Sequence, residues 1–370
     1  EAELSTRKAI QLNPNSVEAH YNLGNILTDL GKLKEAELST RKAIELEPHH
    51  ADAYFTLSFI QLLKGDYQSG LENYEYRLKK KKPAILHCNA TTKKVNQQKL
   101  EKGEKLLVVS EQGLGDTLQF MRYVPYLRNQ GLDISFCAQT KLHSLIKASG
   151  IDSKPLTPEQ ANKVSDGHWI PLLSVPRYLS INPKNPIVSK PYIFSTNELI
   201  EKWRNKLSKE KKPIIGINWQ GSPRLEKVYQ GRSIPLEDFS VIATNNNIKF
   251  LSLQKGFGSE QLAKCSFREQ FVSCQKEIES IWNFLETSAI INSCDLIITS
   301  DTSVAHLAGG MGKPTWLLLK NVPEWRWGIH SDKTFWYPSM RLFRQKEGQN
   351  WEQIMREVSN ELKELISVKE

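Results

Sequence analysis

The sequence lacks several patterns that would place a protein in a class at once. It contains five cysteines, and none of them belongs to a Cys-x-x-Cys pair. An odd number of isolated cysteines argues against a zinc site or a disulfide framework and favours a reducing compartment. No apolar run approaches the roughly 20 residues that a membrane-spanning helix needs. We therefore expect a soluble, cytoplasmic protein, with a peripheral position at the inner membrane surface as the alternative.

Two common nucleotide-binding fingerprints are incomplete. Gly113 and Gly115 form a Gly-x-Gly turn, but the third glycine of the dinucleotide motif is missing. Gly312 and Lys313 precede Pro314, and the glycine that begins a P-loop is absent upstream of them. The sequence therefore predicts neither a dinucleotide site nor a P-loop.

Positive charge is in excess, with a formal net charge of +9. Much of it lies in short lysine-rich runs at residues 79–82, 93–94 and 209–212. Such runs are usually solvated surface or linker, so we expect no nucleic-acid partner. Attraction to an anionic membrane surface or an anionic substrate fits the same charge.

The N-terminal part is repetitive. Residues 1–10, EAELSTRKAI, recur almost letter for letter at residues 35–44, an offset of 34 residues, and Pro14 matches Pro48 at that spacing. This period resembles the tetratricopeptide repeat (TPR), an array of helical hairpins, and the similarity covers residues 1–78. Such hairpins bury their faces only against neighbours. We therefore expect further repeats upstream or docking on the next domain.

Two functions fit the repeats equally well. Asn22 and Asn25 lie on the first helix of a repeat, where they could hydrogen-bond an extended protein or peptide partner. The alternative is a rigid spacer with solvated polar residues.

The rest of the chain alternates strand-like and helix-like segments, which predicts parallel α/β sheets. Apolar runs of strand length begin near residues 106, 135, 169, 214, 249 and 296, and another follows Pro314. The predicted fold class is α/β with an N-terminal all-α part. We expect a TPR solenoid at 1–78, a linker with little regular structure at 79–104, and two Rossmann-like lobes at 105–205 and 206–370.

Polar residues follow two of the predicted strands where a helix begins. Asp116 lies just past the strand at 106–110, and an elbow of four polar residues follows the strand at 296–298: Ser300, Asp301, Thr302 and Ser303. At such elbows, free N–H groups and the helix dipole favour an anion. Arg232 is expected at the same sheet edge, where a diphosphate needs a cation. The alternatives are helix capping by Asp301 or Thr302, a carboxylate at a helix N-terminus for Asp116, a solvated Arg232 and a packing role for His306.

Several segments together resemble a known family. They are EQGLGDTLQFMRYVPYL, GRSIP, DLIITSDTSVAHLAG, GKPTWLLL, EWRW and WYPSMRLFRQ. The sequence from about 104 to 367 is similar to glycosyltransferase family 9, which includes the lipopolysaccharide heptosyltransferases, and most similar to its members fused to TPRs. The resemblance implies a GT-B fold, in which a first Rossmann-like lobe binds mainly the acceptor and a second binds a nucleotide-activated sugar.

The resemblance also implies roles for single residues. Asp116 matches the general base, and the implied donor-binding and phosphate-binding residues are Arg232, Ser300, Asp301, Thr302, Ser303 and His306. Further cleft candidates are Gly113, Gly115, Gln119, Trp219, Gln220, Gln254, Trp325 and Arg326.

The predicted function is an inverting glycosyltransferase that uses a nucleotide-diphosphate sugar. No Asp-x-Asp pair occurs in the sequence, so we expect neither a metal nor another cofactor. The acceptor could be a glycan, a lipid-linked sugar or a protein held by the repeats. The competing hypothesis is a TPR interaction scaffold with a catalytically silent glycosyltransferase-like half. A sugar-nucleotide epimerase needs further acidic and histidine groups, and the sequence identifies none.

Overall fold

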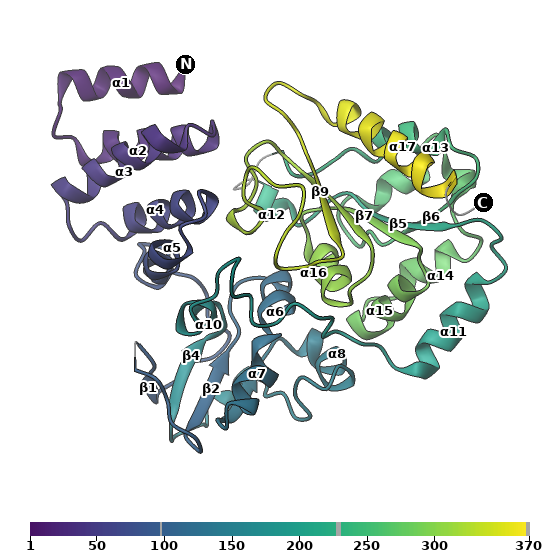
Figure 1. Cartoon of the computed structure of the whole chain (residues 1–370), viewed down its shortest axis with the longest axis horizontal. Coiled ribbons are helices and arrows are strands. Elements are labelled where there is room, and N and C mark those ends of the chain that lie inside the picture. The colour runs from purple at the N-terminus through teal and green to yellow at the C-terminus, as the bar shows by residue number, and fades with distance from the viewer. Residues whose placement is uncertain (97, 227–230, 368–370) are drawn as a thin grey trace.

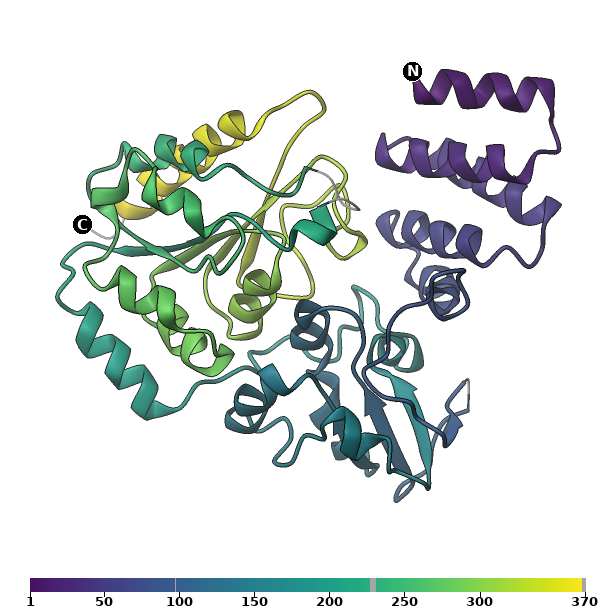
Figure 2. The same ribbon diagram turned by 180° about the vertical axis from the view of Figure 1, so that it is seen from behind.

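The protein has three parts, a helical array and two α/β lobes (Figure 1). A computed structural model describes residues 1–96, 98–226 and 231–367. The N-terminus lies at the far end of the helical array, and the end that carries α5 lies against the first lobe (Figures 1 and 2). None of the described helices combines the length and apolarity needed to cross a membrane.

The helical array consists of antiparallel hairpins, as the 34-residue period predicts. Its elements are α1 (Ala2–Leu12), α2 (Val17–Asp29), α3 (Leu33–Leu46), α4 (Ala51–Leu63), α5 (Tyr67–Tyr74) and the 3₁₀ turn η1 (Glu75–Leu78). Helix pairs approach each other closely where one helix carries a glycine. A Cβ atom on Gly24 would lie 2.3 Å from Thr40 Oγ1, and one on Gly70 would lie 2.6 Å from Leu62 Cγ. Glycine at these two positions therefore permits the helix crossings.

The first lobe is built on a parallel sheet of four strands in the order β1-β4-β2-β3. Its elements are β1 (Lys93–Lys94), β2 (Lys105–Val109), α6 (Leu114–Phe120), α7 (Tyr123–Asn129), β3 (Asp133–Cys137), η2 (Thr140–Leu142), α8 (His143–Ala148), α9 (Pro158–Ala161), β4 (His168–Pro171), η3 (Leu172–Ser174) and α10 (Val175–Tyr178). The helical segment after β2 breaks between α6 and α7. Pro125 explains the break, because in a continuous helix its ring would clash with the carbonyl of Met121, four residues earlier.

The segment at 79–104, predicted as a linker, has little regular structure apart from β1, and it packs against this lobe. Lys93 and Lys94 pair in parallel with β4. Upstream of them, Leu86, Cys88 and Ala90 pack with Leu107, Val109 and Cys137 on one face of the sheet. The composition of the segment is polar, but its few apolar residues cover an otherwise open face.

The second lobe contains a parallel sheet of five strands in the order β6-β5-β7-β8-β9. Its strands are β5 (Ile214–Asn218), β6 (Lys249–Ser252), β7 (Leu296–Ser300), β8 (Thr315–Leu319) and β9 (Met340–Arg344). Its helical segments are α11 (Asn197–Leu207), α12 (Pro223–Glu226), η4 (Leu236–Phe239), α13 (Ser240–Ala243), η5 (Ser259–Ala263), η6 (Arg268–Gln270), α14 (Gln275–Ser280), α15 (Phe284–Asn292), α16 (Ser303–Gly310), η7 (Trp325–Trp327) and α17 (Trp351–Ser367). The sequence analysis did not predict β9.

Strand residues of the second sheet alternate between two buried faces. Leu251, Ile297 and Leu317 pack toward α15 and α16. On the opposite face, Phe250, Ile298 and Leu318 pack toward α13 and α17. Both faces are covered, which explains why the strands appear in the sequence as continuous apolar runs.

The predicted boundary between residues 205 and 206 falls inside α11. This helix packs against α15. Its buried Trp203 donates a hydrogen bond to Glu286 Oε1 at 3.1 Å. By packing, the second lobe therefore begins before residue 197.

The repeats dock firmly on both lobes. One continuous cluster of buried side chains runs from the array through the two lobes. Tyr67 and Tyr74 of the array meet Trp325 of the second lobe edge-on, with ring centroids 6.4 and 5.7 Å apart. On the first lobe, Arg77 inserts into a buried polar pocket at the end of β2. This docking supplies contacts that two repeats alone lack.

Candidate active site

The candidate site lies where the two lobes meet. Helix α6 follows β2 and α16 follows β7, and the two helices contact each other extensively. The contact is closest at Gly115, where a Cβ atom would lie 2.9 Å from His306 Cδ2 and 3.5 Å from Ser303 Cα. The predicted elbows from the two lobes are therefore brought together.

Asp116 lies in the first turn of α6 with both carboxylate oxygens engaged. Oδ2 accepts a hydrogen bond from the Gly113 N–H at 2.9 Å. Oδ1 accepts one from Arg326 Nη2 of the second lobe at 2.6 Å. Arg326 also donates from Nη1 to Glu324 Oε1 at 2.5 Å. One buried guanidinium thus bridges a carboxylate from each lobe.

The elbow after β7 forms a defined turn. Thr302 caps α16, accepting from the Val304 N–H at 3.3 Å and donating to Asn218 Oδ1 at 2.7 Å. The hydroxyl of Ser300 is buried and has no hydrogen-bond partner in the part of the chain that the structure describes. Ser303 begins the helix, so the N–H groups of its first turn and its dipole favour an anion there.

Arg232 lies beside the elbow, as predicted. Its Nη1 donates to the carbonyl oxygen of Asp301 at 3.2 Å. The guanidinium reaches this place because position 221 is glycine, since a Cβ atom there would lie 2.5 Å from Nη2. Among the described residues its Nε has no hydrogen-bond partner, although Glu226 Oε2 lies 3.9 Å away. Within this part of the chain Arg232 therefore retains capacity to bind an anion.

The site concentrates carboxylates around few cations. Burial raises the pKa of Glu324 to about 7, and the nearby Asp301 and Asp116 add to the rise while Arg326 opposes it. Burial also raises the pKa of Asp301, against the charge of Arg232. The pKa of Glu324 therefore depends on the charge of the groups around it.

His306 lies in a buried polar group next to the site. Its Nδ1 is 2.9 Å from the hydroxyl of Tyr337, and its ring stacks on Trp327 with centroids 5.5 Å apart. Burial, together with Arg326 and Arg122, holds the pKa of His306 well below its usual range. The histidine is therefore neutral at physiological pH and packs between the lobes.

Several predicted cleft residues do not line an open cleft. Gln119 and Trp219 are completely buried, and Trp325 is 1% exposed in the contact with the repeats. Gln254 fixes the segment at the end of β5. Its Oε1 accepts hydrogen bonds from three donors, Asn218 Nδ2 and the N–H groups of Trp219 and Gln220. Gln220 accepts from Gln261 at 3.0 Å. Trp219, Gln220 and Gln254 therefore shape the scaffold through internal hydrogen bonds, whereas among the described residues the Gln119 amide and the Trp325 indole N–H are buried without a hydrogen-bond partner.

Three further residues of interest were not predicted from the sequence. Glu324 is the second carboxylate on Arg326, and Asn218 orients Thr302 from the neighbouring strand. Trp282 is 68% exposed and lies 3.5 Å from the Cβ position of Gly256, just after β6. Glu324 stands inside the EWRW motif and could have been noticed there. Asn218 and Trp282 carry no local signal, because their neighbours come from distant segments.

Comparisons with known proteins cover the repeats and the two lobes. The tetratricopeptide repeat family model matches residues 17–50, so these hairpins are TPRs. The chain is 22% identical over 295 residues to Protein FlbA of Caulobacter vibrioides, which covers 72% of this chain and 47% of that protein. The chain thus spans about half the length of this relative.

Solved structures with similar shape are glycosyltransferases. E. coli ADP-heptose LPS heptosyltransferase II matches with a TM-score of 0.49 and 12% identity, over 72% of this chain and 99% of that one. A family 9 glycosyl transferase from Veillonella parvula matches at 0.48 and 13%, over 74% and 100%. An O-GlcNAc transferase mutant from Thermobaculum terrenum matches at 0.33 and 11%, over 99% and 87%. At these scores, similarity in shape assigns no activity to this chain.

Proposed function

We propose that the protein is an inverting, metal-independent glycosyltransferase that moves a sugar from a nucleotide diphosphate to an acceptor hydroxyl. The observation that carries the proposal is the pairing of Asp116 from the first lobe with Arg326 from the second, 2.6 Å apart. The neighbouring Gly115 approaches Ser303, with its Cβ position 3.5 Å from Ser303 Cα, which supports a carboxylate near the turn of Thr302 and Ser303. A proton acceptor and an anion-binding turn are the two elements that the transfer needs.

In the proposed reaction, the acceptor oxygen forms a bond to the anomeric carbon of the sugar. The bond between that carbon and the diphosphate breaks, and the hydroxyl proton passes to Asp116. Each carboxylate oxygen of Asp116 holds one hydrogen bond, which leaves lone pairs free for the acceptor. Arg232 and the start of α16 stabilise the charge on the departing diphosphate. Among the described residues, no three His, Cys, Asp or Glu side chains cluster as metal ligands do.

Exposed aromatic side chains give the donor a place for its base. Trp282 and Phe257 are 68% and 51% exposed, and both lie beyond the carboxyl end of β6. Aromatic faces stack nucleobases, and carboxyl ends of parallel strands are where α/β sheets bind nucleotides. The proposed donor therefore extends from Trp282 to the start of α16. A glycan, a lipid-linked sugar or a protein remains the proposed acceptor, with the TPRs recruiting a partner or the acceptor.

A thermal-shift titration tests the donor site. ADP, UDP, GDP, CMP and dTDP are added, with Mg²⁺ or with EDTA, to the wild type and to Arg232→Gln. One nucleotide at about 100 times its dissociation constant adds roughly 2.7 kcal/mol of stability. We expect one diphosphate to stabilise the wild type equally with and without metal, and to lose most of its effect on the variant.

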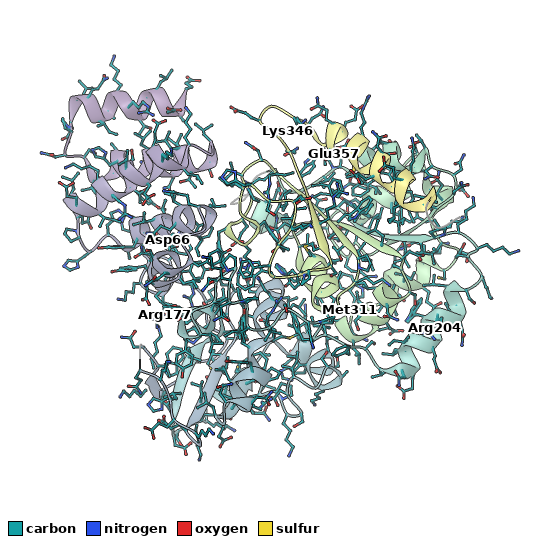
Figure 3. All side chains as sticks on the ribbon, viewed as in Figure 1. Asp66, Arg177, Arg204, Met311, Lys346 and Glu357 are labelled. Carbon is teal, nitrogen blue, oxygen red and sulfur yellow. The ribbon has the colours of Figure 1, made fainter. Side chains whose placement is uncertain are left out.

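The control is Arg204→Gln, an exposed arginine on α11 of the same lobe, far from the repeats (Figure 3). It removes the same charge and is expected to keep the full ligand effect. Stabilisation that requires Mg²⁺ would contradict the metal-independent mechanism. If no nucleotide stabilises the wild type, the silent-scaffold hypothesis replaces the enzyme.

A further inference from the structure

The end of the TPR array carries a buried charge that enters the first lobe. Arg77 of η1 is 1% exposed. It donates to both oxygens of Glu111, from Nε at 2.9 Å and from Nη2 at 2.7 Å, and Nη2 also contacts Ser174 Oγ at 2.8 Å. A paired fork of this kind fixes orientation as well as distance. Glu111 is completely buried and therefore depends on this partner.

Glu111 begins the loop that leads to Asp116. The next residue, Gln112, has a φ of 59°, which is a left-handed backbone conformation that residues other than glycine rarely adopt. Its N–H donates to the Ile85 carbonyl at 3.1 Å, and its side chain lies 3.5 Å from the Tyr74 hydroxyl of the repeats. Gly113 then donates to Asp116. A strained loop persists only where its surroundings hold it, and here the repeats provide part of that hold.

The same end of the array also touches the other side of the site. Tyr74 packs against Trp325, the residue before Arg326. The 3₁₀ turn and the last helix of the repeats therefore contact the segment before Asp116 and the segment that carries its partner. The array is continuous with the site on both lobes.

We propose that Arg77 is a positioning residue, through which the last TPR holds Asp116 in its reactive orientation. The proposal rests on the proposed role of Asp116 and extends it: the repeats are part of the catalytic unit in addition to any recruitment. The alternative is that Arg77 only fastens the repeats to the lobe. A second contact between the repeats and the first lobe distinguishes the two hypotheses.

Arg177 of α10 provides that contact. It joins the same two parts of the chain, with Nη1 3.2 Å from Glu72 Oε2 of α5, and its side chain is 7% exposed. Figure 3 shows it at the junction between repeats and first lobe. Its hydrogen bonds to Glu72 and to the Asn96 carbonyl do not involve the loop at 110–116. Its Nε also lies 3.9 Å from Glu75 Oε1, which Arg77 contacts as well. Arg177→Met therefore weakens the attachment and leaves the pair of Arg77 and Glu111 in place.

The test variant is the double substitution Arg77→Met with Glu111→Gln. Removing both partners avoids an unpaired buried charge, which a single substitution would create. Glu75 loses the contact with Arg77 but retains Lys94 at 3.7 Å. Hydrogen–deuterium exchange of a peptide covering residues 110–118 reports the loop directly in the full chain. We expect exchange at least tenfold faster in the double variant and unchanged exchange in Arg177→Met.

Turnover gives the second readout. The assay uses the nucleotide sugar whose diphosphate stabilises the protein, and it follows release of that diphosphate. We expect kcat to fall at least tenfold in the double variant while KM for the donor stays unchanged, and Arg177→Met to keep wild-type kcat. Wild-type exchange and kcat in the double variant overturn the proposal. If the wild type turns over no nucleotide sugar, the proposed function fails, and exchange alone decides whether Arg77 holds the loop.

Discussion

Glu324 makes the stability of the protein depend on pH in a predictable direction. Burial raises its pKa from an ordinary value of 4.5 to about 7. The folded state therefore binds the proton more tightly than the unfolded state, and the free energy of unfolding falls as pH rises from about 4.5 to about 7. At 1.36 kcal/mol per unit, the shift corresponds to a loss of at most about 3 kcal/mol. Glu324→Gln removes this loss, because the amide does not ionise.

Thermal unfolding of both proteins from pH 4.5 to pH 8 measures the difference. A domain of 150–250 residues changes its midpoint by about 2–4 °C per kcal/mol. We expect the wild-type midpoint to fall by up to roughly 6–12 °C relative to Glu324→Gln as pH rises through this range. A difference between the two midpoints that is independent of pH would refute the assignment of a raised pKa.

The matched control is Glu361→Gln, whose carboxylate has a shift of opposite sign. Its hydrogen bonds to Arg341 lower the pKa of Glu361. This carboxylate therefore contributes stability above its unfolded pKa and loses it as the medium becomes acidic. We expect the wild type to lose stability relative to Glu361→Gln on acidification, the reverse of the trend at Glu324.

Two further predictions concern the reaction and the donor. Asp116→Asn keeps the shape of the side chain but accepts no proton, so we expect kcat to fall by about 10²–10⁴-fold with unchanged diphosphate affinity, measured by product formation and by calorimetry. Wild-type turnover would remove Asp116 as the base. Trp282→Ala should leave the unfolding midpoint unchanged, since the side chain is 68% exposed. It should weaken nucleoside-diphosphate binding by about tenfold, as loss of one stacking contact does. Pyrophosphate binding serves as the control, and equal loss for both ligands would contradict a base platform.

The parts that could be predicted from the sequence are those with a local period. The 34-residue repeat indicates the TPR hairpins, and apolar runs of strand length indicate the two parallel sheets. Strand β9 was missed because MRLFR carries two arginines in five positions without regular alternation and follows a cluster of aromatics. The packing of the segment at 79–104 on the first lobe was not predicted, because composition does not reveal which few apolar residues cover a sheet.

The sequence predicts the polar residues that follow the strands, but it does not predict which distant residues they contact. Asp116, Arg232 and Asp301 to Ser303 lie near one another, because carboxyl ends of parallel strands and the helices after them share one edge. The contact between Asp116 and Arg326 joins residues 210 positions apart, which no local pattern encodes. Trp219 and Gln254 follow strands just as Asp301 does. Their burial depends on loops that close over them, and so their position at a strand end was misleading.

The contact between the lobes also fixes how the site is organised. Arg122 of the first lobe is 2% exposed and donates to the Trp336 carbonyl of the second lobe at 2.6 Å. Its other donors reach the carbonyls of Gln119 and Val188 and the hydroxyl of Tyr192. Parting the lobes here would break the hydrogen bond from Arg122 to the Trp336 carbonyl, and a hydrogen bond that involves a charged group contributes about 1.5–3 kcal/mol.

The free energy that holds Arg122 in place therefore also holds Asp116 against Arg326, since both contacts join α6 and the segment after it to the same part of the second lobe. A site that must stabilise developing charge gains most when its groups are oriented before the ligand arrives. The repeats strengthen the same arrangement from a third side, through Tyr74 and Trp325. Substitutions that loosen any of these buried contacts should act first on the orientation of Asp116, and only then on the attachment of the parts to one another.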